Sequence, residues 1–170
     1  MNYSIVISYL YPTAVVEVDF SVLLNGTEWS ITKWNTAKLG PQPTPAQLET
    51  AWPAAQLQAA QTRQRAIIKS SFTAAANANV TDASGIVWEG GMASGNSIFL
   101  ACQLAQQMGT TSLTLYDAAK NAHSMTIAEG MSVAALIGSA YQTALGQKNA
   151  LYAQIDAATT VSAVQTVVWP

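Results

Sequence analysis

The chain has 170 residues and half of them are apolar, so it can bury a core in one large domain or two small ones. Lys, Arg, Asp and Glu make up only 9% of the residues and the net charge is −2, which leaves too few basic residues for a surface that follows a nucleic-acid backbone. One cysteine excludes an intrachain disulfide, and we find neither a signal peptide nor an apolar run of the ~20 residues that a spanning helix needs, so no membrane partner is expected.

Charged residues are also unevenly distributed along the chain. No residue from Gly90 to Tyr116 or from Ala157 to Pro170 carries a charge, and thirteen glutamines help to keep the surface hydrated. A weakly charged exterior has little electrostatic protection against association. We interpret it as a surface that a partner protein covers in part. The alternative is an Ala- and Gln-rich domain that needs no partner.

Segment 1–40 is predicted to be a small β unit. Apolar and polar residues alternate over 16–22 with the strand period of two, and residues 3–11 are a further strand candidate. Asn25-Gly26 is the preferred pair for a two-residue type I′ turn. Counting outward from this turn puts the apolar residues of both strands on one buried face, with the pairs Val22–Trp29 and Phe20–Ile31.

Segment 41–79 is predicted to be a Pro-rich turn followed by a connecting helix. Thr44 as N-cap, Pro45 at the first helical position and Gln47 three residues after Thr44 form a capping box. Pro53 removes a backbone donor, so we expect it to kink or divide the helix. Residues 74–79 are expected to fray into a linker.

Segment 80–170 is predicted to be a C-terminal domain of helices with a short β-hairpin. A strand at 86–88 precedes a helix over 94–108, which Gly109 stops. Strands at 111–115 and 123–126 flank a turn, and Thr126 with Glu129 forms the capping box of the longest helix. Thr160 can cap a last short turn. The fold class is therefore α+β, with strands and helices segregated.

The sequence offers few groups for catalysis or for a cofactor. His123 and Asp117 could form a dyad across their turn, but we favour a structural role in which Asp117 bonds turn amides and His123 pairs across the hairpin. Cys102 lies on an apolar helix stripe and is interpreted as a small buried side chain. One His and one Cys do not complete a zinc site, and Gly90-Gly91 lacks the lysine of a phosphate loop. We predict a protein that is not an enzyme and holds no metal or cofactor.

The last third of the chain resembles a C-terminal domain found in tailed-phage proteins. The resemblance rests on Gly85 to Gly91, on the run from Leu115 to Glu129, and on the closing Ala-Thr-Thr-Val phrase with Trp169. Genes that carry this domain usually neighbour tail-fibre genes, and their products are mostly described as fibre assembly factors.

The first third resembles the XkdW-like phage proteins. The matching residues are Tyr9-Leu10-Tyr11-Pro12, Val18-Asp19-Phe20, Ile31 with Lys33-Trp34-Asn35, Leu39-Gly40, Gln42-Pro43-Thr44-Pro45 and Leu48-Glu49. Together the two resemblances imply a tail-fibre assembly chaperone that binds a fibre protein, expected to be trimeric, in the host cytoplasm. The resemblances are also compatible with a second assembly protein as a partner, and with a protein that stays attached to the tail fibre in the virion. The alternative is a permanent structural component of the tail fibre or baseplate.

A partner would be bound through aromatic and helical residues that have no obvious place in a core. Trp and Tyr are enriched at interfaces because they bury a large area and still offer a polar handle. Trp88 and Trp169 are expected to pack on each other in the C-terminal domain, although Trp169 is also a contact candidate. The partner-binding candidates are Trp52, Leu57, Gln61, Gln64, Ile68, Phe72 and Trp169.

Overall fold

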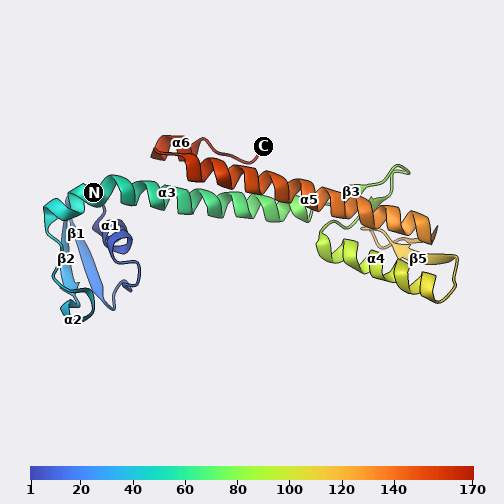
Figure 1. Cartoon of the computed structure of the whole chain (residues 1–170), viewed down its shortest axis with the longest axis horizontal. Coiled ribbons are helices and arrows are strands. Elements are labelled where there is room, and N and C mark those ends of the chain that lie inside the picture. The colour runs from blue at the N-terminus through green and yellow to red at the C-terminus, as the bar shows by residue number, and fades with distance from the viewer. The chain divides into compact units, whose positions relative to one another are not determined.

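The computed structural model describes residues 1–170 and confirms the α+β class (Figure 1). The elements are α1 (Tyr3–Leu10), β1 (Phe20–Asn25), β2 (Glu28–Trp34), α2 (Thr36–Leu39), α3 (Pro45–Ala76), β3 (Val80–Thr81), β4 (Val87–Trp88), α4 (Met92–Gln107), β5 (Ser112–Tyr116), β6 (Ala122–Thr126), α5 (Ile127–Ala157) and α6 (Val161–Gln165). The strands form three separate antiparallel pairs, β1 with β2, β3 with β4 and β5 with β6.

The chain divides into two compact units, each with its own apolar core. The first unit comprises Met1–Arg65 with Gln154–Val167, and the second comprises Ala66–Ala153 with Val168–Pro170. Two of the three boundaries lie inside the long helices α3 and α5, and the third lies between Val167 and Val168, after α6. The division into a β unit (1–40), a turn with a connecting helix (41–79) and a C-terminal domain (80–170) stays a prediction.

The first element is a helix, so the strand expected over residues 3–11 is wrong. The Asn2 side chain caps α1 by accepting a hydrogen bond from the backbone N–H of Ser4, 3.0 Å away. Tyr3, Val6 and Ile7 follow the spacing of one helical face, and the latter two are fully buried. Adjacent β-branched residues favour a strand locally, but this cap and this packing decide the outcome.

The strand expected from residue 16 begins only at Phe20. Val16 makes a single parallel bridge to Phe20, and Glu17 has a positive φ of 66°. Asp19, expected on a polar exposed face, is instead buried. Its carboxylate accepts hydrogen bonds from the Lys38 ammonium and from the backbone N–H of Val15, and the Lys38 bond is the largest cause of its lowered pKa. The bond from the Val15 N–H to the Asp19 carboxylate and the bond from the Asp19 N–H to the Val15 carbonyl close residues 15–19 into a turn, and Lys38 pairs with the same carboxylate from the surface.

The turn between β1 and β2 lies one residue later than expected. Asn25 pairs with Glu28, so Gly26 and Thr27 form the loop, and of these only Gly26 has a positive φ (64°). A glycine with positive φ at the first central position matches a type II′ turn rather than type I′.

From Val22 to Asn25 the pairing of β1 with β2 is shifted by two residues from the expected register, and a bulge between Ser21 and Val22 then pairs Phe20 with Trp34. Trp29 pairs with Leu24 rather than with Val22, and Ile31 pairs with Val22 rather than with Phe20. An even shift keeps Val22 and Ile31 on their predicted face, whereas a shift of one would invert them. Both pack against the core in which Phe20, beyond the bulge, is fully buried.

Helix α3 begins with the predicted capping box but is not divided. The Gln47 side chain accepts from the backbone N–H of Thr44 at 2.8 Å, and the Thr44 hydroxyl accepts from the backbone N–H of Gln47 at 3.3 Å. Pro53 lies within the helix without interrupting it. Residues 74–76 are helical and Ala76 is buried, so the expected fraying there is wrong.

In the second unit, α4 packs against α5. Gly95 of α4 lies against Ile137, and Gly130 of α5 lies against Cys102. Trp88, Leu115, Val133 and Ile137 form the core beside the β5–β6 hairpin. Gly109 ends α4 with φ 70°, as predicted, and α4 begins at Met92, two residues earlier than expected.

The predicted caps of the later helices are confirmed. The Glu129 carboxylate accepts from the backbone N–H of Thr126 at 2.7 Å, and the Thr126 hydroxyl accepts from the backbone N–H of Glu129. The Thr160 hydroxyl accepts from the backbone N–H of Ala163 at 3.1 Å and begins α6.

Candidate partner-binding surfaces

The α3 face predicted to bind a partner is used inside the protein at two glutamines. The Gln61 side chain donates to the carbonyl of Ile155 at 3.0 Å, close to the end of α5. Gln64 is buried and donates to the carbonyl of Val167 at 2.6 Å. The Ile155 carbonyl lies in the last turn of α5, where carbonyls lack a helical partner four residues on, and the Val167 carbonyl lies beyond the end of α6, so each is available to a glutamine. The expectation that this face has no intramolecular use is therefore wrong for both residues.

The same correction applies to two candidates in the second unit. Ile68 is fully buried. Phe72 makes an edge-on ring contact with Tyr141, with ring centroids 5.9 Å apart, and the Lys148 ammonium lies 4.8 Å from its centroid. A substitution at Ile68 therefore tests stability before it tests binding.

The remaining candidates are half-buried. Trp52 packs against the core of the first unit, and Leu57 and Trp169 keep part of their surface exposed. Trp88 was expected to pack on Trp169. Its ring contact is instead with His123, with 5.6 Å between the ring centroids. Partner binding through Trp52, Leu57 or Trp169 stays a prediction.

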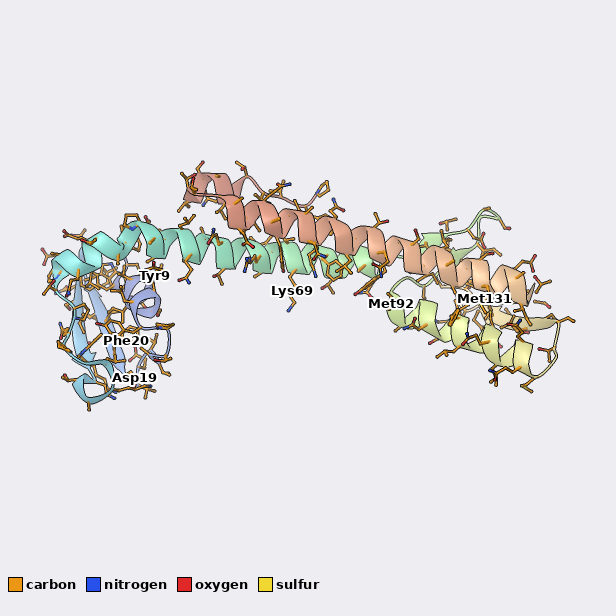
Figure 2. All side chains as sticks on the ribbon, viewed as in Figure 1. Tyr9, Asp19, Phe20, Lys69, Met92 and Met131 are labelled. Atoms are coloured by element: carbon orange, nitrogen blue, oxygen red, sulfur yellow. The ribbon has the colours of Figure 1, made fainter.

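A groove that the sequence did not reveal lies between the end of α1 and the start of α3. Its volume is about 700 Å³, and no charged side chain lines it. Tyr9 projects from α1 on the side of α3 (Figure 2) and, with Leu10, keeps more than a third of its surface exposed. The lining residues are Tyr9, Leu10, Tyr11, Pro43, Ala46, Gln47, Thr50, Ala51 and Ala54. The groove was missed because residues 3–11 were predicted to be a strand.

Helix α4 presents a second apolar surface. Leu100, Leu104 and Met108 follow one another at intervals of four residues and are all exposed. Phe99, also exposed, lines a shallow groove between α4 and α5 together with Met92 and Met131, which Figure 2 labels. No charged residue lies anywhere on this helix.

His123 and Asp117 are paired, as both interpretations of these residues require. Their side chains approach to 3.0 Å between Nε2 and Oδ2. Asp117 also accepts from the backbone N–H of Asn121 at 2.8 Å and from its side-chain amide at 3.0 Å, so it bonds the turn as predicted. His123 stands opposite Leu115 in the hairpin. No serine, cysteine or lysine nucleophile is bonded to this pair, and we interpret it as a structural clamp of the turn.

The Asp117 clamp predicts acid sensitivity. Hydrogen bonds, above all the one from His123, lower the pKa of Asp117 from 3.8 to about 2. A carboxyl whose pKa is lower in the folded protein stabilises it above the unfolded pKa, and this contribution is lost as the pH falls. We therefore expect the free energy of unfolding to decrease as the pH falls from 3.8 towards 2. Urea denaturation at a series of pH values measures it.

Asp117→Asn provides the control for this pH dependence. The variant cannot titrate at residue 117, so its stability should fall less steeply over the same range. A residual slope is expected because Asp19, Asp82 and Glu129 also have lowered pKa values. If the free energy of unfolding fell equally steeply with pH in Asp117→Asn and in the unmodified protein, Asp117 would not contribute to the acid sensitivity.

Cys102 has the environment of a core residue. It is fully buried, its thiol pKa is raised by burial, and its Sγ lies against Gly130. A thiol with a raised pKa is a poor nucleophile at neutral pH. No group of three or more His, Cys, Asp or Glu side chains is placed to hold a metal ion. None of the helices combines the length and apolarity that crossing a membrane requires.

Comparison with known families identifies one region. Residues 4–60 match the family model described as XkdW protein, a phage-associated family, which confirms the resemblance of the first third of the chain. The matched segment contains the whole lining of the α1–α3 groove. No curated protein and no solved structure matches the chain. The resemblance of the last third to a tail-fibre-associated domain stays a prediction.

Proposed function

We propose that this protein is a tail-fibre assembly chaperone of a tailed bacteriophage. It binds the fibre protein in the host cytoplasm, shields its apolar surface until the fibre trimer forms, and can remain attached in the virion. The observation that carries this proposal is the α1–α3 groove, because its lining lies entirely within the segment similar to a phage-associated family. Apolar clefts with a few polar groups are the usual sites of recognition in proteins.

The lining of the groove suits an uncharged, extended segment of the fibre. Ala46, Ala51 and Ala54 have small side chains that let a peptide backbone come close. The phenols of Tyr9 and Tyr11 offer apolar surface with a polar tip, a combination common at binding surfaces. An unassembled fibre exposes strand edges and apolar patches. Such a segment would bind through apolar and main-chain contacts.

Co-expression tests the chaperone role directly. The neighbouring fibre gene is expressed with and without this protein, and soluble trimeric fibre is measured by size-exclusion chromatography with light scattering. We expect a clear gain in soluble trimer when the protein is present. Equal yields would exclude the chaperone role. Purified virions then test the alternative, because a permanent component of the fibre or baseplate occurs in fixed ratio to the fibre.

Ala54→Arg tests the groove itself. The residue is exposed on α3, so arginine is tolerated by the helix but places bulk and charge in the groove. We expect the affinity for the fibre to fall at least about tenfold, as for a blocked interface centre. Ala74→Arg, the same change at an exposed position of α3 outside the groove, is the matched control and should bind normally.

Salt provides a second measure of the same contact. Screening weakens exposed charge interactions only, so binding through an uncharged groove should persist at about 1 M NaCl. Loss of the complex at that salt concentration would contradict binding by apolar and main-chain contacts. If the Ala54→Arg and Ala74→Arg proteins bound the fibre equally well, the binding site would lie outside the groove.

A further inference from the structure

Trp34, the last residue of β2, is in contact with both sides of the α1–α3 groove without lining it. Its ring meets the ring of Tyr11 edge-on, with 5.1 Å between the centroids. Its indole N–H donates to the carbonyl of Gly40 at 2.8 Å, three residues before Pro43. Tyr11 and Pro43 both line the groove, whereas Trp34 does not. One side chain outside the groove therefore contacts one wall and supports the approach to the other.

We propose that Trp34 is the positioning residue of this groove. It holds the Tyr11 phenol on the side of α1 and the segment that leads to Pro43 on the side of α3. It thereby sets the shape that the groove offers to the fibre segment. This inference rests on the proposed function of the groove and adds a residue that acts without touching the partner.

The bulge between Ser21 and Val22 puts Trp34 in its place. With an unbroken register Lys33 would stand opposite Phe20, but the bulge puts Trp34 there. The Trp34 ring lies 6.4 Å from the ring of the fully buried Phe20 and packs against the core, while Lys33 stays exposed. Bulges are over-represented next to functional sites, where they re-aim a side chain. The break in register is therefore what directs Trp34 towards the groove.

The ring contact fixes the Tyr11 wall. Tyr11 follows the last residue of α1, and its backbone has left the helix, with φ −127° and ψ 74°. The helix therefore does not set the direction of this side chain. Aromatic rings prefer edge-to-face arrangements, so a neighbouring ring imposes an orientation as well as a contact. The Trp34 ring supplies that orientation to the phenol.

The hydrogen bond to Gly40 fixes the Pro43 wall. The Gly40 N–H donates to the Thr36 carbonyl at 3.0 Å at the end of α2, so Gly40 is held from both sides. Segment 41–43 after it reads Pro-Gln-Pro. Proline fixes its own φ and restricts the residue before it to extended backbone. This stiff segment transmits the position of Gly40 to Pro43, which is buried and lines the groove.

NMR of the free protein tests the positioning without any partner. Trp34→Phe keeps an aromatic ring beside Tyr11 but has no N–H for the Gly40 carbonyl. We expect the backbone carbon resonances of residues 40–44 to shift in this variant. Trp29→Phe, the same change at the other end of β2 beside the turn, is the matched control and should leave these resonances unchanged. Shifts that stop at Gly40, or that are equal in both variants, would overturn the inference.

Calorimetric titration with the fibre protein then measures the effect on binding. We expect Trp34→Phe to weaken binding about twofold to tenfold, the effect of one hydrogen bond. Trp34→Leu also loses the ring contact with Tyr11 and should weaken binding at least about tenfold. Trp29→Phe should bind like the unmodified protein. If Trp34→Phe were less stable in urea but bound the fibre with unchanged affinity, Trp34 would be a core residue only, and the inference would be overturned.

The two experiments separate this inference from the proposed function. If the unmodified protein did not bind the fibre protein, the chaperone role would fail, and the NMR shifts of residues 40–44 would still decide whether Trp34 positions the groove. If the unmodified protein and Trp34→Phe bound the fibre equally well, the groove would keep its function and Trp34 would have no positioning role.

Discussion

A Trp88→Ala variant is expected to lose about 3–5 kcal/mol of unfolding free energy, the usual cost of removing a large aromatic side chain from a core. Trp88 is fully buried against Leu115, Val133 and Ile137. Its indole N–H also donates to the Asp82 carboxylate at 2.8 Å. Domains are stable by only about 5–15 kcal/mol, so the variant should be largely unfolded at modest urea concentrations. Urea denaturation followed by far-ultraviolet circular dichroism measures the loss.

Trp88→Phe separates the packing of the ring from its hydrogen bond. Phenylalanine keeps an aromatic ring in the core but has no N–H, so we expect a smaller loss of about 1–2 kcal/mol. The hydrogen bond from Trp88 is the largest cause of the lowered pKa of Asp82, so this pKa should rise in the variant. An NMR titration of the side-chain carboxyl resonances measures the pKa of Asp82. A loss below about 1 kcal/mol in Trp88→Ala would contradict the placement of Trp88 in the core.

Local chemistry made several parts of the fold predictable. The capping boxes at Thr44 and Thr126 and the stop at Gly109 each involve residues within a few positions of one another, and all three were predicted. The faces of the β1–β2 hairpin were also predicted, although its register was not. Turns at residues 25–26 and 26–27 put the same side chains inward, so hydrophobic pattern alone does not distinguish them.

Long-range contacts explain what could not be predicted. The strand expected before Phe20 is replaced by a turn in which the Asp19 carboxylate accepts from the Val15 N–H, and this carboxylate also pairs with Lys38, nineteen residues further along the chain. The sequence predicts partner binding by the α3 face because it shows no intramolecular use for that face. Gln61 and Gln64 instead satisfy carbonyls 94 and 103 residues away. The α1–α3 groove depends on two elements meeting, one of which was predicted as a strand.

Any side chain at position 90 is expected to destabilise the fold, because it would clash with the backbone. A Cβ added to Gly90 would lie 1.8 Å from the carbonyl oxygen of Ala78 and 2.7 Å from its carbonyl carbon. Both are backbone atoms, so the segment joining α3 to β3 would have to move. We expect Gly90→Ala to cost about 3 kcal/mol, the upper end for overpacking. Thermal and urea unfolding measure it.

Gly130 and Gly146 provide contrasting controls for Gly90→Ala. A Cβ at Gly130 would lie 2.5 Å from the Cys102 Sγ, a side-chain atom, so Cys102→Ala should recover most of the loss caused by Gly130→Ala. No side-chain substitution can relieve the Gly90 clash, because the opposing atoms belong to the backbone. A Cβ at Gly146 meets nothing within 4 Å, and alanine there should stabilise α5 by about 0.5–1 kcal/mol. Similar stability of Gly90→Ala and Gly146→Ala would mean that Ala78 does not pack against Gly90.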